Sequence, residues 1–298
     1  MKIDFLCVGF QKCATTTLDA VLRQNKNIIL PQTKEVHLDM WYHKYNNPMN
    51  IIKNKFFDKN IDSGKLIGII DPELENDPRM VYDCMGKDVK LIFIMRNPVD
   101  RLFSFYKMAL WLGFPRVYGS TLNGDKIQCV RQSFARYVRE ELKKEEKSID
   151  LCRGNYIDKI LEFLKYYNKA NMKFIIFEEY IRNPEKVVNE LFDFLQVPNQ
   201  NINYNIWEGG GKISKNKICF KINNKLSTLR ECARCNSKVG LEIYQKIDSI
   251  CDIVFEITAV SNTEKIDANI KKRLERYYRE SKERLEEFLE IDLSKVWF

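Results

Sequence analysis

The stretch IDFLCVGFQKCATTTL, residues 3–18, predicts a strand, a tight loop and the start of a helix. The apolar run Ile3–Val8 is typical of a buried strand, and apolar residues recur at helical spacing after Thr17. A helix N-terminus offers unpaired N–H groups and a partial positive charge, which together bind anions. Lys12 adds a full positive charge beside them. The stretch therefore predicts a phosphate-binding loop whose candidate residues are Gly9, Lys12, Cys13, Ala14, Thr15, Thr16 and Thr17.

This loop differs from the G-x-x-x-x-G-K-[ST] motif of ATP-hydrolysing enzymes, in which the lysine comes late and a hydroxyl residue holds magnesium. Here Lys12 comes early and no Gly-Lys-Thr sequence follows it. A P-loop kinase is therefore disfavoured. Taken alone, the threonines are also compatible with a surface loop that merely caps a helix.

The rest of the chain predicts a three-layer α/β fold with a central, mostly parallel sheet of about five strands. Short apolar runs alternate with helical periodicity, which is typical of helices that cover both faces of a sheet. We expect one domain over residues 1–298, a loop or lid over about 199–224, and a C-terminal helix over about 265–290. The expected strands are Ile3–Val8, Asn27–Leu30, Leu66–Ile70, Lys90–Met95 and Lys173–Phe177.

The bulk composition is that of a globular protein with an affinity for anions. The chain has 298 residues and a formal net charge of +8, with 45% hydrophobic and 30% charged residues. This moderate positive charge suits nucleotides and other anionic ligands. We expect no nucleic-acid partner. We also expect no membrane insertion, because no run approaches the ~20 apolar residues of a spanning helix. A homo-oligomer is compatible with the sequence.

The nine cysteines show no paired framework, and we see no secretory signal before the first predicted strand. An odd number of cysteines without such a signal predicts reduced thiols in the cytoplasm. Cys232 and Cys235 form the one Cys-x-x-Cys pair, and the two further ligands that a zinc site needs do not follow at similar spacing. We therefore expect no metal.

A second anion-binding element follows the strand Lys90–Met95, where the chain reads Arg96-Asn97-Pro98-x-x-Arg101-x-x-Ser104. Open α/β sheets bind ligands at the carboxyl ends of their strands, which is where Arg96 lies. Ser104 follows about two helical turns later. A guanidinium fork and a hydroxyl that converge in this way can hold a phosphate.

Together the two elements resemble the 5′-phosphosulfate loop and the 3′-phosphate motif of sulfotransferases that use 3′-phosphoadenosine-5′-phosphosulfate (PAPS). The family's loop reads roughly G-x-x-K-x-G-T-T-x-L and its second motif R-[DN]-P-x-x-R-x-x-S. This chain departs from the loop at Ala14, where the family has Gly and where a positive φ is poorly tolerated by Ala. The resemblance continues at Gly154-Asn155-Tyr156, at 177–184 and near the C-terminus at 289–297.

The resemblance implies that PAPS is the co-substrate and that no metal takes part. By position, Lys12 contacts the 5′-phosphosulfate and stabilises the leaving phosphate, with the loop threonines completing the cradle. Arg96 and Ser104 hold the 3′-phosphate. The glycine-flanked lysines Lys212 and Lys215 suit a lid that closes on the nucleotide, and equally suit a solvated basic loop.

The segment Lys34-Glu35-Val36-His37-Leu38-Asp39 resembles the E-V-H-F-F-D segment of heparan sulfate and related carbohydrate sulfotransferases, in which Glu is the catalytic base. The resemblance makes Glu35 the base and His37 its neighbour in the site. His37 as base, or neither residue, remain the alternatives. Lys34, Asp39 and Asp71 are candidates for binding the acceptor, although Asp39 lies one position before the family's Asp.

The favoured interpretation is a PAPS-dependent sulfotransferase that acts on a carbohydrate such as a glycan, a capsular or a lipid-linked sugar. A small alcohol, phenol or amine is the alternative acceptor. A nucleotide- or polyanion-binding protein without catalysis is the alternative from another class. That alternative would keep Lys12, Arg96 and Ser104 but would have no use for Glu35.

Overall fold

The computed structural model describes residues 2–58, 64–114, 118–123, 126–131, 133–144, 147–206 and 211–298, with the backbone alone over 118–131. The chain divides into two compact units, each built from separate stretches of sequence. The first comprises Met1–Pro98, Asn155–Gly209 and Glu280–Phe298, and the second comprises Val99–Gly154 and Gly210–Arg279. The sheet and the phosphate loop belong to the first unit.

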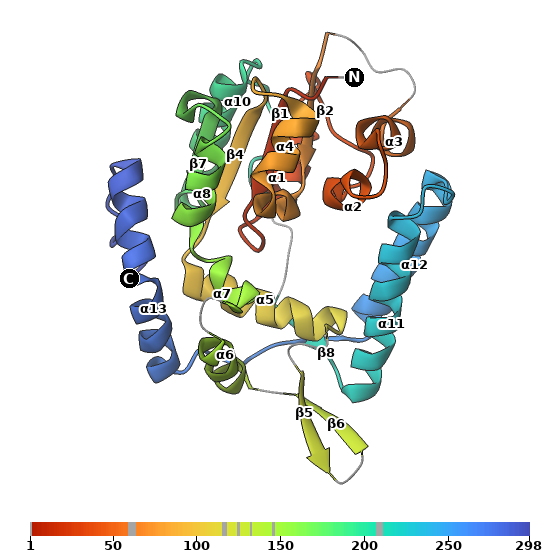
Figure 1. Cartoon of the computed structure of the whole chain (residues 1–298), viewed down its shortest axis with the longest axis vertical. Coiled ribbons are helices and arrows are strands. Elements are labelled where there is room, and N and C mark those ends of the chain that lie inside the picture. Colours follow the sequence, from red (N-terminus) through yellow and green to blue (C-terminus); the bar gives the residue numbers. More distant parts are fainter. Residues whose placement is uncertain are drawn as a thin grey trace. The chain divides into compact units, whose positions relative to one another are not determined.

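A central five-stranded parallel sheet flanked by helices forms the first unit (Figure 1), which confirms the fold class expected from the sequence. Its strand order is β2-β3-β1-β4-β7. The strands are β1 (Phe5–Gly9), β2 (Ile28–Ile29), β3 (Leu66–Ile70), β4 (Lys90–Met95) and β7 (Met172–Ile176). Two of them, β3 and β4, have the bounds that their apolar runs predicted.

The helices of the first unit follow the strands in sequence. They are α1 (Thr15–Leu22), α2 (Leu38–Tyr42), α3 (Pro48–Phe56), η1 (Pro72–Asn76), α4 (Pro78–Met85), α8 (Tyr156–Leu164), η4 (Lys169–Asn171), α9 (Phe177–Arg182) and α10 (Pro184–Leu195). Both α4 and α10 begin with proline, whose fixed φ suits the first helical position and whose missing N–H costs nothing there.

Burial explains why these strands lie at the centre of the sheet. All five residues of β1 are buried, and so are five of the six residues of β4. Gly68 on β3 is required by close packing, because a Cβ there would lie 2.0 Å from Cζ of the buried Phe5 ring. Apart from Lys90, the central strands β1 and β4 are therefore apolar, as expected of parallel strands covered on both faces.

The second unit is mainly helical. It contains α5 (Pro98–Leu112), the hairpin β5 (Tyr118–Asn123) and β6 (Lys126–Arg131), α6 (Phe134–Lys143), α7 (Ile149–Cys152), β8 (Lys212–Ser214), α11 (Lys217–Arg234), α12 (Leu241–Ile257) and β9 (Ala259–Ser261). The helix α13 (Ala268–Leu289) begins in this unit and ends in the first. Arg101 is fully buried and donates to the backbone carbonyl of Asp150.

The expected loop over about 199–224 is wrong from Lys212 onward. Residues 212–214 pair with β9 as the antiparallel strand β8, and α11 begins at Lys217, capped by the side chain of Asn216. Several apolar residues of this helix, Ile218 and Ile222 among them, are exposed, so the apolar pattern did not indicate a helix packed on a core. Gly209 and Gly210, two of the glycines that precede the lysines of the expected lid, lie outside the described residues.

Candidate functional site

The phosphate loop leaves β1 at Gly9 and enters α1 at Thr15, with two residues in the left-handed region. Lys12 and Ala14 both have a φ of 69°. Ala14 is the N-cap residue of α1 and has no side-chain oxygen, so the first N–H groups of the helix receive no acceptor from it. Thr15 and Thr17 are buried while Thr16 is exposed. The turn thus leaves the positive end of α1 without a side-chain cap, an arrangement that suits an anion.

Lys12 is partly buried in this loop, and burial lowers the pKa of its ammonium group to about 8. The positive charges of Lys34 and Arg96 lower the pKa further, while Glu35 opposes them. The structure therefore brings Lys12 into the electrostatic range of three other predicted site residues. A bound anion would restore the charged form of Lys12, because an opposite charge favours it.

Arg96 lies at the carboxyl end of β4, next to the phosphate loop. Its Nη1 lies 3.5 Å from the Lys12 carbonyl oxygen, and its guanidinium stacks on the Phe177 ring at 4.5 Å. The Tyr156 hydroxyl donates to the Arg96 carbonyl at 2.7 Å. Within the described chain, Arg96 Nε is buried without a hydrogen-bond partner. An unsatisfied buried donor costs about 1–3 kcal/mol, so a phosphate oxygen is the fitting ligand for it.

Glu178, which the sequence analysis did not single out, holds this corner of the site together. Its Oε1 accepts the Asn97 backbone N–H and its Oε2 accepts the Trp297 indole N–H, both at 2.9 Å. Burial raises the pKa of Glu178, and these two donors oppose the rise. Three segments that resemble sulfotransferase sequences, around residues 97, 178 and 297, therefore meet at one carboxylate. Asn97 adjoins Arg96, so the contact positions the guanidinium.

The segment with the candidate base follows β2 and is bound to the end of β3. Glu35 and His37 have φ values of 61° and 51°, again in the left-handed region. The Glu35 N–H donates to the Ile70 carbonyl at 3.3 Å, and the His37 N–H donates to Asp71 Oδ2 at 2.7 Å. Of the six non-glycine residues with positive φ in the described ranges, four belong to this segment or to the phosphate loop. Such strain is typical of functional sites.

Asp71 has a different place from the one expected for an acceptor-binding residue. It is completely buried, and its second oxygen, Oδ1, accepts the Glu73 N–H at 3.2 Å. Burial raises the pKa of Asp71 to about 6; the charge of His37 opposes the rise, and Glu35, Asp39 and Glu73 add to it. Because both oxygens bind backbone N–H groups and none of the side chain is exposed, Asp71 positions the His37 segment.

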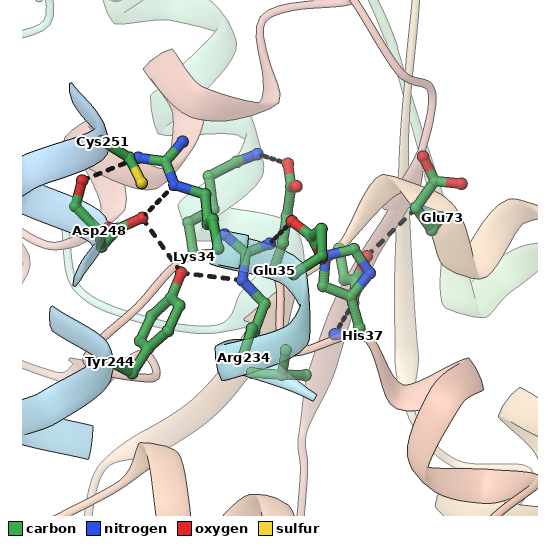
Figure 2. A network of polar contacts seen from close by, with 12 residues as sticks. Lys34, Glu35, His37, Glu73, Arg234, Tyr244, Asp248 and Cys251 are labelled. Atoms are coloured by element: carbon green, nitrogen blue, oxygen red, sulfur yellow. Dashed lines mark hydrogen bonds and ion pairs between the residues drawn. The ribbon is translucent and has the colours of Figure 1, made fainter. Parts of the chain in front are cut away.

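Lys34 and Glu35 form an ion pair at the edge of this segment (Figure 2). Their side chains are 16% and 31% exposed, so the Glu35 carboxylate is reachable by a ligand. Asp39 lies in the first turn of α2, and its Oδ1 is buried without a hydrogen-bond partner among the described residues. A donor from an acceptor molecule would satisfy this oxygen.

Two further predicted positions complete the phosphate loop. A Cβ at Gly9 would lie 3.2 Å from Oε2 of the fully buried Glu75, so a side chain at this position would crowd a carboxylate. The thiol of Cys13 is buried 3.9 Å from the Tyr156 hydroxyl. Both residues thus shape the loop backbone.

The remaining predicted residues belong to the second unit. Ser104 lies on α5 and is partly exposed. Lys212 pairs with Glu256 at 2.6 Å, and Lys215 donates to the Ile257 carbonyl at 2.7 Å. Lys212 lies on the strand β8 and Lys215 just after it, and both lysines have partners inside their own unit.

The described ranges contain no group of three His, Cys, Asp or Glu side chains placed to hold a metal ion. Over the same ranges, every helix is too short or too polar to cross a lipid bilayer.

The sequence of this chain is similar to those of known proteins. The family model described as "Sulfotransferase domain" matches residues 2–208. A curated relative, bifunctional heparan sulfate N-deacetylase/N-sulfotransferase 1 of Caenorhabditis briggsae, is 22% identical over 252 residues, which are 83% of this chain. The match covers 28% of that larger protein, so the chain spans less than a third of its length.

The fold is also found in solved structures. A sulfotransferase from Alicyclobacillus acidocaldarius has a TM-score of 0.58 at 19% identity, with 99% of this chain and 98% of that chain covered. At this identity the likeness concerns the fold alone. Mouse sulfotransferase SULT7A1 complexed with PAP has a TM-score of 0.46 at 16% identity, covering 94% of this chain and 84% of that chain.

The left-handed conformation of Ala14 leads to a testable prediction. Alanine with positive φ costs roughly 1–2 kcal/mol, whereas glycine carries no such cost. We expect Ala14→Gly to raise the free energy of unfolding by up to about 1 kcal/mol, after the greater entropy of glycine in the unfolded chain is subtracted. Urea denaturation followed by circular dichroism measures the change.

Ala20, in the middle of α1, is the matched control. Glycine there should lower the free energy of unfolding by about 1 kcal/mol, as in other helix interiors. Equal destabilisation by both substitutions would contradict the left-handed conformation of Ala14.

Proposed function

The chain belongs to the sulfotransferase domain family, and from this membership we propose that it transfers a sulfuryl group from PAPS to a hydroxyl or amine of a carbohydrate acceptor. The observation that supports the proposal is Lys12, which lies in the left-handed turn just before α1 and whose ammonium group has its pKa lowered by burial. The Lys34–Glu35 ion pair acts on the same ammonium group. This proximity supports a site in which Lys12 meets the leaving phosphate and Glu35 takes the acceptor proton.

The donor site uses the two anion-binding elements. Lys12, the N–H groups of the loop and the hydroxyls of Thr15, Thr16 and Thr17 hold the 5′-phosphosulfate. Arg96 and Ser104 hold the 3′-phosphate, which distinguishes PAPS from ATP. The buried, unpartnered Arg96 Nε supports this assignment. Lys212 and Lys215 are further candidates for nucleotide contacts. To make them, each lysine would exchange its present protein partner for a phosphate oxygen.

In the proposed reaction the acceptor oxygen or nitrogen attacks sulfur in line with the bond to the 5′-phosphate. The new bond to sulfur forms as the bond from sulfur to the phosphate oxygen breaks. Glu35 takes the acceptor proton, and Lys12 neutralises the charge that develops on the leaving phosphate. His37, held through its backbone beside Glu35, is the alternative base. No step requires a metal, because the charges involved are met by Lys12 and backbone N–H groups.

A carbohydrate acceptor is supported by the Glu35–His37 segment and by the heparan sulfate N-sulfotransferase relative. Lys34, beside the base, suits an acceptor that carries carboxylate or sulfate groups. The unpartnered Asp39 oxygen suits a sugar hydroxyl or amine donor. The cysteines of the sequence, odd in number and without a paired framework, support a reaction in the reducing cytoplasm.

The lowered pKa of Lys12 predicts how donor affinity depends on pH. The ammonium form, which binds the anion, is lost as the pH rises through about 8. Between pH 7 and pH 9 the affinity for 3′-phosphoadenosine-5′-phosphate (PAP) should therefore fall roughly tenfold, with proton uptake on binding near pH 8. Calorimetric titration in buffers of different ionisation enthalpy measures both effects.

Lys12→Arg, which stays charged at every pH used, is the control and should show a flat profile. A slope unchanged in this variant would assign the pH dependence to another group.

The assignment of Glu35 as the base predicts that its removal slows turnover without weakening the binding of PAP. Glu35→Gln should lower the rate of PAP release from PAPS by roughly 10²–10⁴-fold, because proton removal contributes about that much to catalysis. Its affinity for PAP should stay within about threefold, since the substitution keeps the shape of the side chain. The assay offers de-N-acetylated heparosan, a neutral polysaccharide and a phenol as acceptors.

Glu73→Gln is the matched control, because Glu73 is a carboxylate close to Asp71 that accepts from Gln11 Nε2 and has no proposed role in proton transfer. It should keep most of the wild-type turnover. Full turnover in Glu35→Gln would remove Glu35 as the base. A wild-type protein that binds PAP but releases none from PAPS with any acceptor would contradict the catalytic proposal.

A further inference from the structure

The peptide group that joins Arg96 to Asn97 is held at both of its polar ends by side chains. Its carbonyl oxygen, which belongs to Arg96, accepts the Tyr156 hydroxyl at 2.7 Å. Its N–H, which belongs to Asn97, donates to Glu178 Oε1 at 2.9 Å. A peptide group is a rigid plane that includes the preceding Cα atom, so contacts on its two opposite edges fix the direction in which the Arg96 side chain leaves the backbone.

Trp297 contacts both of the side chains that hold this peptide group. Its indole N–H donates to Glu178 Oε2 at 2.9 Å. Its ring centroid lies 5.9 Å from that of Tyr156, and the two rings are tilted by 58°. Aromatic rings at this separation attract each other. These contacts form a closed set, called the Trp297 clamp below, which comprises Trp297, Glu178, Tyr156 and the peptide group 96–97.

The C-terminal segment that carries Trp297 is itself fixed. Glu286 Oε1 on α13 accepts the Leu293 N–H at 2.7 Å, and the Leu293 carbonyl accepts the Trp297 N–H at 2.7 Å. Leu293 is buried and anchors the segment in the core. All of these residues belong to the first unit, together with the clamp. A chain of contacts therefore connects the end of α13 to Arg96.

The indole contact also decides which groups the Glu178 carboxylate binds. Burial raises the pKa of Glu178, and its N–H donors oppose the rise. The positive charge of Arg96 opposes it as well, so this carboxylate and the guanidinium lie within electrostatic reach of each other. A partly buried carboxylate oxygen that loses its donor has to find another. Without the indole, the Arg96 guanidinium is a nearby group that could take its place.

We propose that Trp297 is a positioning residue for nucleotide recognition. Its indole occupies one oxygen of Glu178, so the carboxylate stays on the Asn97 N–H and leaves the Arg96 guanidinium to the ligand. The C-terminal segment thereby sets the selectivity for a 3′-phosphate. This inference rests on the proposed role of Arg96 in holding that phosphate. Trp297 acts through Glu178 and Tyr156, so it affects donor affinity and not the chemical step.

A role of Trp297 in packing alone explains fewer of these contacts. A buried indole N–H usually finds some acceptor, so the hydrogen bond by itself carries no functional meaning. The identity of the acceptor is what points to nucleotide recognition. Glu178 also binds the residue next to Arg96, and Arg96 Nε is buried without a hydrogen-bond partner among the described residues. Packing against Tyr156 would be served equally well by phenylalanine.

Calorimetric titration of Trp297→Phe with PAP and with ADP tests the proposal. Phenylalanine keeps an aromatic ring and removes the N–H. The affinity for PAP should fall about tenfold, whereas the affinity for ADP, which has no 3′-phosphate, should stay within about twofold. In turnover the KM for PAPS should rise by a similar factor while kcat stays within about threefold. A residue that only packs would lower stability without changing the ratio of the two affinities.

A double-mutant cycle tests whether Trp297 acts through Glu178. Glu178→Gln should lower the PAP-to-ADP affinity ratio by itself, and adding Trp297→Phe should then change it by less than about twofold. Trp41→Phe is the matched control. The Trp41 indole N–H donates to the Val36 carbonyl at 2.8 Å in the same unit, away from the clamp. Its loss should leave the PAP-to-ADP ratio unchanged.

The possible results separate this inference from the proposed function. A wild type that prefers PAP, with the same preference in Trp297→Phe, overturns the inference and leaves the donor site in place. Effects of Trp297→Phe and Glu178→Gln that multiply fully overturn it too, because the indole would then act independently of the carboxylate. A wild type that binds PAP and ADP equally removes the assignment of Arg96 to the 3′-phosphate, and the inference with it.

Discussion

The parallel pairing of β1 with β3 on one side and β4 on the other is the constraint on which the candidate site depends. Because all three strands run in the same direction, the loops that follow them emerge at the same edge of the sheet. The phosphate loop follows β1, the Asp71 turn follows β3 and Arg96 follows β4. The chemistry of the site is thus assembled from three separate stretches of sequence by backbone hydrogen bonds in the sheet.

Buried carboxylates then hold these loops in strained conformations. Asp71 binds the His37 N–H, and Glu178 binds the Asn97 N–H, so each loop is attached to a buried acceptor. Charged acceptors bind N–H groups about twice as strongly as neutral ones, which offsets the strain of left-handed residues such as Glu35. The exposed groups that we assign to catalysis are therefore positioned by buried groups that do not react.

The sequence predicted the sheet and the phosphate loop because both depend on local patterns. Continuous apolar runs marked β3 and β4, and a lysine before a run of threonines marked the loop. The positioning residues were not predictable in this way, since Glu178 lies 81 residues from Asn97 and Asp71 lies 34 from His37. The positive φ of Glu35 and His37 has no signature in non-glycine residues. The helix α11 was missed because its isoleucines face outward, so its pattern did not match burial against a core.

We propose that the edge of the sheet beyond β1 and β4 is a binding site for a nucleotide with a 3′-phosphate. Calorimetric titration with PAP and with ADP, both without magnesium, tests it most directly. A charge-assisted contact from Arg96 to the 3′-phosphate is worth about 1.5–3 kcal/mol, so PAP should bind roughly 10–100-fold more tightly than ADP. Equal affinities, or binding of either nucleotide only with magnesium, would contradict the account.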